Sequence, residues 1–371
     1  MHRNLRTEIK PGMQKLSVAR FLLTFALIFT SLSLFAKDAE KGNNGGAVDT
    51  KEEIKAYIDH HLLDSYDFTL WSDGEAGTHV GFPLPVILWD DGLKVFSSSK
   101  FHHGETVAEV DGNYYKLYHG KIYKTDAEGT ITMDQEGHHP TNDKPLDFSI
   151  TKNVITMLLA GLLLFLMFRG LAKSYKKNGA IPKGFGRFLE PLVIFVRDEI
   201  AIPNIGEKKY KKYMSFLLTV FFFVWLLNLL GMTPLGVNVT GNIAVTFGLA
   251  LLTFLITNFT ANKNYWGHIF WMPGVPTFMK IVLAPIELLG VFIKPFSLMI
   301  RLYANMTAGH VVLMSIIGMV VLFKSWIGSP LSFGLAFALA ILELLVAALQ
   351  AYIFTMLSAL YFGMANEEAH H

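Results

Sequence analysis

The stretch MIRLYANMTAGHVV, from Met299 to Val312, places an arginine, an asparagine and a histidine inside a long apolar segment. Hydrocarbon penalises such groups heavily, and a central arginine costs about 2.5–3.5 kcal/mol on insertion scales. An arginine also stays protonated, because its pKa exceeds about 12, so it requires an anionic partner or water. Charges inside membrane helices are usually functional, and we therefore interpret this stretch as the centre of the protein's chemistry.

The overall composition is that of an integral membrane protein. The 371 residues are 52% hydrophobic and only 17% charged, and they include 30 phenylalanines. Such a chain is too apolar for a soluble protein with one ordinary core. The net charge is +2, and the basic residues gather beside hydrophobic segments instead of alternating with aromatic ones. Nucleic-acid binding therefore receives no support.

Five apolar segments are candidates to cross a bilayer. They lie at 153–172, 214–232, 243–260, 281–323 and 331–363. A continuous helix over the fourth segment would reach roughly 60 Å, twice the hydrocarbon thickness of about 30 Å. Either Pro285 and Pro295 bend this helix or it lies strongly tilted. We expect an all-α polytopic membrane protein of about five spans, in which two long, tilted C-terminal helices form an antiparallel pair.

The amino-terminal part has the pattern of an exported region. Lys15 and Arg20 precede an apolar run that ends at Ala36 and is followed by polar residues, which predicts a signal peptide over 1–36. An uncleaved membrane anchor is the alternative. Residues 37–150 then form an exported region, and 151–371 form the transmembrane domain.

A small β-rich insert is expected within the exported region, at about 72–145. The segments HVGFPLPVILW, TVAEV, YYKLYHGKIYKT and TITM are separated by DG, HG and EG pairs. Such pairs are typical of tight turns between the strands of hairpins.

The distribution of positive charge predicts the orientation in the membrane. The loop 173–213 contains ten Lys/Arg against four acidic residues, which places it in the cytoplasm. The next loop, TPLGVNVTGN, is uncharged and fits the opposite side. Counting spans then places the carboxyl terminus in the cytoplasm. We expect a multi-pass protein of a bacterial inner membrane with a periplasmic amino-terminal region.

Ionisable groups in the fourth segment follow one helix face. Glu287, Lys294 and Arg301 recur at intervals of seven, and Asn305 lies four residues beyond. Glu287 and Lys294, near the cytoplasmic end, form a polar stripe that either serves the transport path or simply reaches the interface and pairs internally. For Arg301 the alternative is an ion pair within its own helix, but charges inside membrane helices usually serve a function.

The fifth segment adds Glu343 and Gln350, which are also seven residues apart. In antiparallel helices Arg301 faces Gln350 near mid-membrane, and His310 faces Glu343 nearer the exterior. A histidine beside a carboxylate in a low dielectric is suited to relaying protons. A buried structural salt bridge is the alternative. Asn228, in the second segment, is a further candidate for the same proton path.

These residues resemble the a subunit of the rotary ATP synthase membrane sector. The likeness is carried by KPFSLMIRLYANMTAGH (294–310), LQAYIFTMLSALYF (349–362) and ANEEAH (365–370), and more weakly by NLLGMTP (228–234). By position, Arg301 is similar to the family's essential arginine, which faces a carboxylate of the rotating c ring. Asn305 and Gln350 are similar to its polar neighbours.

The His310–Glu343 pair is exchanged relative to many bacterial members of this family. Those members have an acid where this chain has His310 and a histidine where it has Glu343, whereas mitochondrial relatives share the arrangement seen here. Because the exchange keeps one acid and one imidazole, it favours an interacting pair. The β-rich insert departs from shorter members of the family.

The resemblance implies a stator subunit that conducts protons through two offset half-channels and performs no catalysis itself. The implied partners are the oligomeric c ring, the peripheral-stalk b subunits, the remaining ATP synthase subunits and the lipid bilayer. No cofactor is expected, and no metal, because no recognisable ligand spacing is present.

Two other functions are weighed against this one. A stand-alone ion channel or secondary transporter needs its own carboxylate near Arg301, but the segments 214–232 and 243–260 contain no ionisable side chain. An intramembrane hydrolase needs a Ser/His pair or a motif such as HExxH, and the apolar segments contain neither pattern.

Overall fold

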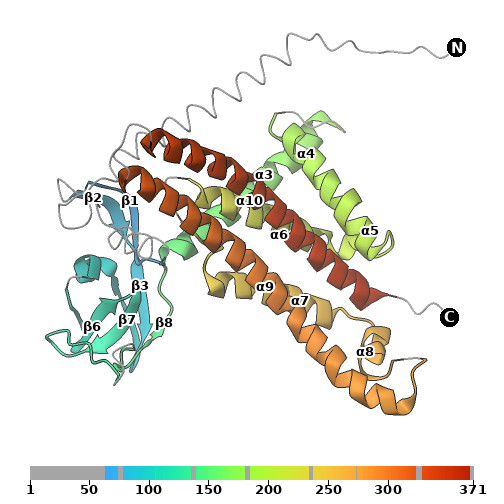
Figure 1. The fold of residues 1–371 in the computed structure, drawn as a ribbon, viewed down its shortest axis with the longest axis horizontal. Coiled ribbons are helices and arrows are strands. Elements are labelled where there is room, and N and C mark those ends of the chain that lie inside the picture. The colour runs from blue at the N-terminus through green and yellow to red at the C-terminus, as the bar shows by residue number, and fades with distance from the viewer. Residues whose placement is uncertain are drawn as a thin grey trace, which may run out of the picture.

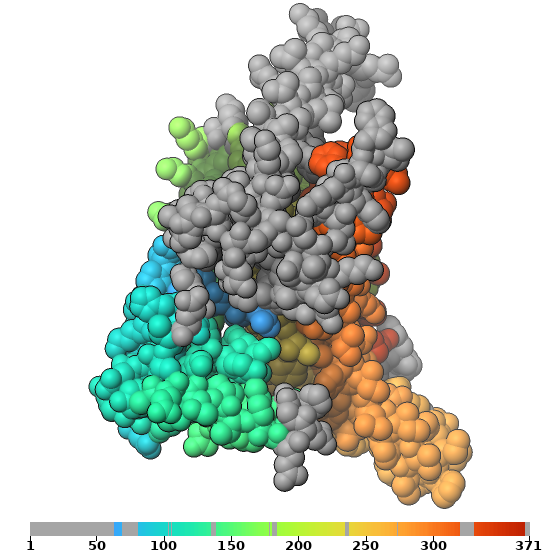
Figure 2. All heavy atoms as spheres, turned by 60° about the vertical axis from the view of Figure 1, so that its left-hand side comes forward, coloured from blue at the N-terminus to red at the C-terminus, as the bar shows by residue number. Residues whose placement is uncertain are grey.

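The computed structural model describes residues 63–367, apart from 74–77, 105, 135–138, 180–183, 234–236, 273 and 323–327. The expected signal peptide and the start of the exported region lie outside the described residues. Short strands gather at one end of the molecule and helices make up the rest (Figure 1). The space-filling view shows the strands and the first turns of α9 at opposite lower corners (Figure 2).

Among the described residues, four helices are long and apolar enough to span a membrane. They are α3 (Lys152–Asn178), α6 (Tyr210–Gly231), α9 (Thr277–Leu322) and α10 (Gly328–Asn366). A fifth candidate span combines α7 (Ile243–Phe259) with α8 (Lys263–Phe270), which meet at an angle of 99°. The prediction of a mostly helical chain with about five candidate spans and amino-terminal strands is confirmed, although α8 was not anticipated.

The helix α9 continues through both of its prolines. Pro285 and Pro295 lie inside its 46 residues, which extend for about 69 Å. The chain is therefore not interrupted at either proline, and an element of this length fits a bilayer by tilting. α10 lies beside α9 (Figure 1).

A helical segment fills much of the basic loop between α3 and α6. It consists of α4 (Gly186–Phe195), a π-helical turn η2 (Val196–Ala201) and α5 (Ile202–Ile205). α5 contacts α10 at Gly363, where an added Cβ would collide with the Asn204 carbonyl oxygen. Glycine is therefore needed for this close approach.

The core of the helical part is built from large side chains of α6, α10 and the segment between α3 and α6. Its fully buried members include Leu189, Ile200, Leu217, Phe354 and Phe362. Because these residues come from distant parts of the chain, their packing fixes α6 and α10 against each other.

Polar contacts hold the end of α10. The Asn366 side chain donates to Tyr213 Oη at 2.6 Å, and Tyr213 in turn donates to Thr260 Oγ1 at 2.7 Å. The Asn366 carbonyl accepts from Lys209 Nζ at 2.8 Å and from Asn262 Nδ2 at 3.1 Å. The start of α6, the end of α7 and the start of α8 thus meet the end of α10.

Residues 63–151, here called the strand region, contain eight strands. Their bounds are β1 Asp67–Asp73, β2 Thr78–Pro83, β3 Pro85–Trp89, β4 Leu93–Ser97, β5 Ala108–Val110, β6 Asn113–Tyr118, β7 Lys121–Thr125 and β8 Leu146–Asp147. They form a β1–β2 hairpin and two three-stranded sheets, β4–β3–β8 and β5–β6–β7. A 3₁₀ helix, η1 (Ser98–Gly104), follows β4.

The turns follow the sequence prediction, but several of the strands do not. Asp91, Asp111 and His119 have positive φ, and each precedes a glycine in a tight turn between strands. β1, β4 and β8 were not predicted. The segment TITM was expected to be a strand, but it contributes only an isolated bridge from Met133 to Pro140. This segment pairs with its neighbour at one residue only, so no ladder of hydrogen bonds forms and no strand results.

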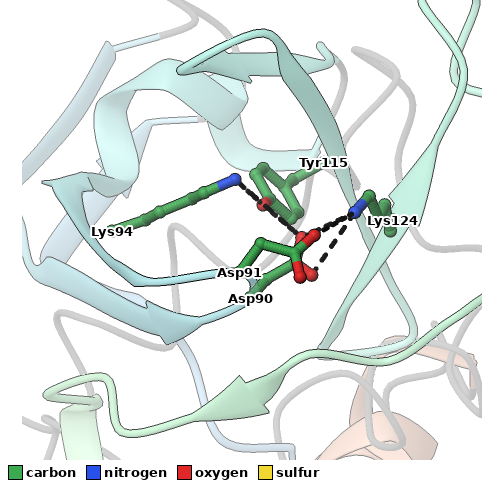
Figure 3. Close-up of polar contacts among 5 residues, drawn as sticks. All are labelled: Asp90, Asp91, Lys94, Tyr115 and Lys124. Carbon is green, nitrogen blue, oxygen red and sulfur yellow. Dashed lines mark hydrogen bonds and ion pairs between the residues drawn. The ribbon is translucent and has the colours of Figure 1, made fainter.

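A polar cluster joins the two three-stranded sheets (Figure 3). Tyr115 Oη donates to Asp90 Oδ2 at 2.7 Å, and Lys94 Nζ donates to Tyr115 Oη at 2.9 Å. Lys124 Nζ lies 3.0 Å from Asp90 Oδ2. Lys94 and Tyr115 are buried, so the cluster satisfies polar groups that the hydrophobic core of the strand region would otherwise isolate.

Both ends of the strand region are attached to the start of α3. The Asp64 carboxylate accepts from the Asn153 amide at 3.2 Å, and the Ser65 carbonyl accepts from the Lys152 amide at 2.8 Å. Thr151 makes no side-chain cap, so Asp64 supplies an acceptor for the first turn of α3 from 89 residues away. Tyr66 also donates a hydrogen bond to Asp147.

Candidate functional site

The polar side chains of α9 and α10 lie along the contact between these helices. The first contact joins Asn305 Nδ2 to Gln350 Oε1 at 2.7 Å. Gln350 is fully buried, and its Nε2 has no hydrogen-bond partner among the described residues. The amide of Gln350 is therefore oriented by Asn305 and keeps a donor available.

Arg301 lies one turn before Asn305 on the same helix. It is half-buried. Met299 and Leu302, which lie close to it in the sequence, are buried, whereas Ile300 is exposed. Within the described part of the chain, no carboxylate lies within ion-pair distance of its guanidinium. Because an arginine cannot lose its charge in a protein, the described chain leaves this cation available to an outside anion.

His310 and Glu343 form the second contact between α9 and α10. His310 Nδ1 lies 3.6 Å from Glu343 Oε1, and both residues are buried. His310 Nε2 and both Glu343 carboxylate oxygens have no hydrogen-bond partner among the described residues. A buried pair with so many unsatisfied atoms is a costly arrangement for a purely structural contact.

Asn228 of α6 lies between these two contacts. Its Nδ2 approaches the Ala347 carbonyl at 3.4 Å, and its Oδ1 accepts from Thr240 Oγ1 at 2.9 Å. Ala347 is four residues after Glu343 and three before Gln350 on α10. Asn228 therefore extends the polar path from α10 to α6.

Sequence reasoning missed the contribution of the segment between α6 and α7. Asn238 and Thr240 are buried there, and the Asn238 side chain accepts from the Gly241 amide. The uncharged sequence of this loop gave no reason to expect burial. The only sequence signal for burial was that the loop contains small polar residues, whose side chains can be buried once they form a hydrogen bond.

Two glycines let helices approach the buried pair. A Cβ on Gly309 would lie 3.2 Å from Glu343 Oε1, and a Cβ on Gly231 would lie 3.4 Å from His310 Nε2. Larger residues at these positions would displace the carboxylate or the imidazole. Because Gly309 directly precedes His310 in the sequence, its role in the close approach of the two helices could have been predicted.

The stripe toward the start of α9 is arranged differently. Lys294 Nζ lies over the Tyr361 ring, 5.7 Å from its centroid. Glu287 and Lys294 act on each other electrostatically but form no ion pair within 4.0 Å. Lys294 also lines a small pocket with Thr253, Asn258 and Tyr265. These polar groups surround α9 on the side of its amino terminus.

The described residues contain no group of three or more His, Asp or Glu side chains placed to hold a metal ion. The site offers a fixed cation at Arg301, the His310–Glu343 acid–imidazole pair and the hydrogen-bonded amides of Asn305 and Gln350.

Comparison with known proteins gives two family matches. Residues 154–363 match the family described as ATP synthase A chain. Residues 57–148 match a family described only as a domain of unknown function. The two matches fall on the helical part and on the strand region.

Curated relatives named ATP synthase subunit a occur in several bacteria. That of Chloroherpeton thalassium is 43% identical over 61% of this chain and 69% of the relative. That of Myxococcus xanthus is 45% identical over 62% of this chain and 77% of the relative. For Anaeromyxobacter sp., the identity is 34% over 90% of this chain and 75% of the relative, so this alignment reaches beyond the helical part.

Proposed function

This chain belongs to the ATP synthase A chain family, and from that premise we propose that it is the stator subunit that conducts protons to and from a rotating c ring. The observation that carries the proposal is Arg301, a half-buried cation with no ion-pair partner among the described residues, next to the contacts between α9 and α10. A permanent charge in this setting suits an anion that arrives from another subunit and leaves again.

Protons enter from the exterior through the groups around His310, Glu343 and Asn228. They neutralise a carboxylate of the c ring, travel with the ring for nearly one rotation and leave to the cytoplasm. The unsatisfied atoms of His310 and Glu343 support this path, because each has the capacity to exchange a proton or a hydrogen bond with water. The membrane potential supplies about 2.3 kcal/mol per charge per 100 mV.

Arg301 separates the two half-channels. Its positive charge repels hydronium and favours the ionised form of each ring carboxylate, so protons cross only by moving with the ring. Asn305 and Gln350, which are hydrogen-bonded to each other, orient polar groups next to this cation. Glu287 and Lys294 form the polar stripe on the cytoplasmic side, where protons leave.

The helices α9 and α10 act as an antiparallel pair. The order of their contacts supports this: Asn305 meets Gln350, whereas His310, further along α9, meets Glu343, which comes earlier on α10. The arrangement places the acid–imidazole pair and Arg301 at different depths. That separation is what two offset half-channels require.

The proposed orientation in a bacterial inner membrane follows from the charge of the basic loop. The segment before α3 is periplasmic and comprises a signal peptide over 1–36 and an exported region over 37–150 that includes the strands. The transmembrane domain is 151–371, and its carboxyl terminus is cytoplasmic. The partners are the c ring, the b subunits of the peripheral stalk and the other ATP synthase subunits, and no cofactor is required.

Replacing Arg301 tests the role of the fixed cation. In membrane vesicles that contain the assembled enzyme, Arg301→Ala is expected to abolish proton-driven ATP synthesis, while the soluble head still hydrolyses ATP. Arg169→Ala, which changes an arginine of α3, is the matched control and should retain synthesis. Preserved synthesis in the Arg301 variant would contradict the proposal.

A further inference from the structure

The β4–β3–β8 sheet is apolar on both faces. Val86 and Leu88 of β3 and Phe96 of β4 are buried in the core of the strand region. The opposite face carries Ile87, Trp89, Leu93, Val95, Leu146 and Phe148, here called the outer sheet face. These residues lie in register, because Trp89 is paired with both Leu93 and Leu146 and Ile87 is paired with Val95.

The described residues leave the outer sheet face uncovered. Five of its six side chains are strongly exposed, with fractions of 56% for Trp89, 61% for Leu93, 59% for Val95 and 63% for both Leu146 and Phe148. An antiparallel sheet that faces water normally alternates apolar and polar residues. A contiguous apolar face with a central tryptophan instead indicates a surface that meets an apolar partner.

The outer sheet face is held close to the start of a membrane span. Phe148 precedes Lys152, the first residue of α3, by four residues, a distance of about 14 Å at most. The Phe148 amide donates to the Ile87 carbonyl at 2.8 Å, and the Ile150 amide donates to the Pro85 carbonyl at 3.1 Å. The chain that leads into α3 is therefore an extension of the sheet, not a loose linker.

Exposed side chains in the first half of α3 are apolar, as are those of the outer sheet face. Its 27 residues extend for about 40 Å, more than the hydrocarbon thickness of about 30 Å, so its first turn has room to lie among the lipid headgroups. Leu158, Leu159 and Leu162 are exposed on α3 as lipid-facing residues are. Along the chain, the outer sheet face ends at Phe148, ten residues before Leu158.

Two lysines from different parts of the chain, Lys144 just before β8 and Lys121 at the start of β7, lie close to each other. Burial and the nearby charge of Lys121 lower the pKa of Lys144, while Asp147 opposes this effect. Lys144 is two residues from Leu146, and Lys121 follows a turn at Gly120 that contacts Leu63 and Asp64, beside the start of α3. Paired lysines next to an apolar face are suited to the phosphates of anionic lipids.

We propose that the outer sheet face lies on the membrane, in the lipid leaflet at the amino-terminal end of α3. The tryptophan, leucine and phenylalanine side chains enter the boundary between headgroups and acyl chains, to a depth of about 5–10 Å. The strand region is then a second membrane contact that holds the start of α3 at a fixed depth. This inference does not depend on which ion the protein conducts.

Spin labels distinguish lipid from water at this face. The chain contains no cysteine, so Leu93→Cys and Val95→Cys each give one labelling site. Glu109→Cys, at an exposed position of β5 outside the outer sheet face, is the matched control. The full-length chain is reconstituted in liposomes of phosphatidylcholine and phosphatidylglycerol. Collisions with oxygen, which partitions into lipid, are compared with collisions with a water-soluble nickel chelate.

We expect the ratio of oxygen to nickel collisions to be severalfold higher for the Leu93 and Val95 labels than for the Glu109 label. Equal ratios would overturn the proposal. Labels that are exposed to water in liposomes but become protected in the assembled ATP synthase would also overturn it, because a protein subunit would then be the partner of this face.

A second variant tests whether the face acts as a unit. Leu93→Asp/Val95→Asp changes two outward-facing side chains, so the fold should be retained, which circular dichroism checks. A label at Phe148→Cys is expected to move from lipid to water in this variant. A Phe148 label that stays in lipid would show that the sheet does not determine the contact, and the proposal would be wrong.

Discussion

Arg301 is set apart by its chemistry from the other polar residues of the helical part. Neutral amides such as Asn305 and Gln350 satisfy each other at 2.7 Å, and the buried His310–Glu343 pair has the capacity to become neutral. Arg301 has neither option, because a guanidinium group is not deprotonated in proteins. A residue that must remain a cation in the membrane is suited to act on a partner whose charge changes.

The His310–Glu343 pair yields a prediction at the same scale. If the two groups pass a proton as a unit, His310→Ala and Glu343→Gln should each lower ATP-driven proton pumping by about 100-fold. The exchanged double variant His310→Glu/Glu343→His should pump better than either single variant, because it keeps one acid and one imidazole 3.6 Å apart. Pumping is followed by quenching of a pH-sensitive dye in vesicles.

Proton pumping by the exchanged variant can also contradict the prediction of a relay. If its loss equals the product of the two single losses, the residues act independently and the pair is not a relay. An immunoblot for the subunit in each membrane preparation controls for assembly.

At the scale of elements, the register of α10 against its neighbours decides which polar groups meet. This register is held at one end by Asn366, Tyr213 and Asn262, which connect α10 to α6 and to the chain between α7 and α8. It is held closer to the middle by the buried side chain of Phe354. A shift of one residue would turn Gln350 and Glu343 away from α9.

Tyr213→Phe tests the hold on the end of α10. The variant keeps the ring that stacks on Phe362 but removes the hydroxyl that joins Asn366 to Thr260. The loss of these buried hydrogen bonds should cost about 1 kcal/mol and lower the midpoint of thermal unfolding in detergent by about 2–4 °C.

Tyr352→Phe is the matched control, because the Tyr352 hydroxyl makes no hydrogen bond among the described residues. We expect no change in its unfolding midpoint. Equal midpoints for both variants and the unmodified chain would show that the contact at Asn366 does not stabilise α10.

The link between the two three-stranded sheets is sensitive to acid. The hydrogen bond from Tyr115 lowers the pKa of Asp90 below its ordinary value of 3.8, and Lys124 adds to this effect while burial opposes it. A carboxyl with a lower pKa in the folded state stabilises the fold above the unfolded pKa. The contribution is lost as pH falls through the folded pKa. The strand region should therefore lose stability below about pH 4.

Asp90→Asn checks this pH dependence. The variant should be less stable than the unmodified chain at pH 7, by about 1 kcal/mol, and the difference should shrink as the pH falls below 4. Unfolding of the full chain in detergent, followed by tryptophan fluorescence, measures both. A difference that stays constant from pH 7 to pH 3 would rule out Asp90 as the titrating group.

For the whole molecule, the proposed orientation places the strand region and the basic loop on opposite sides of the membrane. Glu109→Cys on β5 should react with a membrane-impermeant maleimide in cells with a permeabilised outer membrane. Lys211→Cys, in the first turn of α6, should react only after the inner membrane is opened. The unmodified chain contains no cysteine and is the control for background labelling. Labelling of both variants from the same side would contradict the proposed orientation.

Much of the helical part was predictable because its signals are local. Apolar runs set the positions of the spans to within a few residues, as with 214–232 for α6 (Tyr210–Gly231). The DG and HG pairs marked turns of the strand region, because a positive φ depends on the residues in the turn itself. β4 and the failed strand TITM show the limit of this reasoning, since a strand exists only if a partner lies beside it.

The sequence by itself determined the class of the protein, the charge of Arg301 and the family motif around it, because composition, residue spacing and side-chain chemistry are properties of the local chain. Only the tertiary structure decided that Thr240 meets Asn228, that Asp64 supports the first turn of α3 and that six apolar side chains share one face of a sheet. The first two of these contacts join residues 12 and 89 positions apart. Their formation depends on how whole elements pack, which no short stretch of sequence specifies.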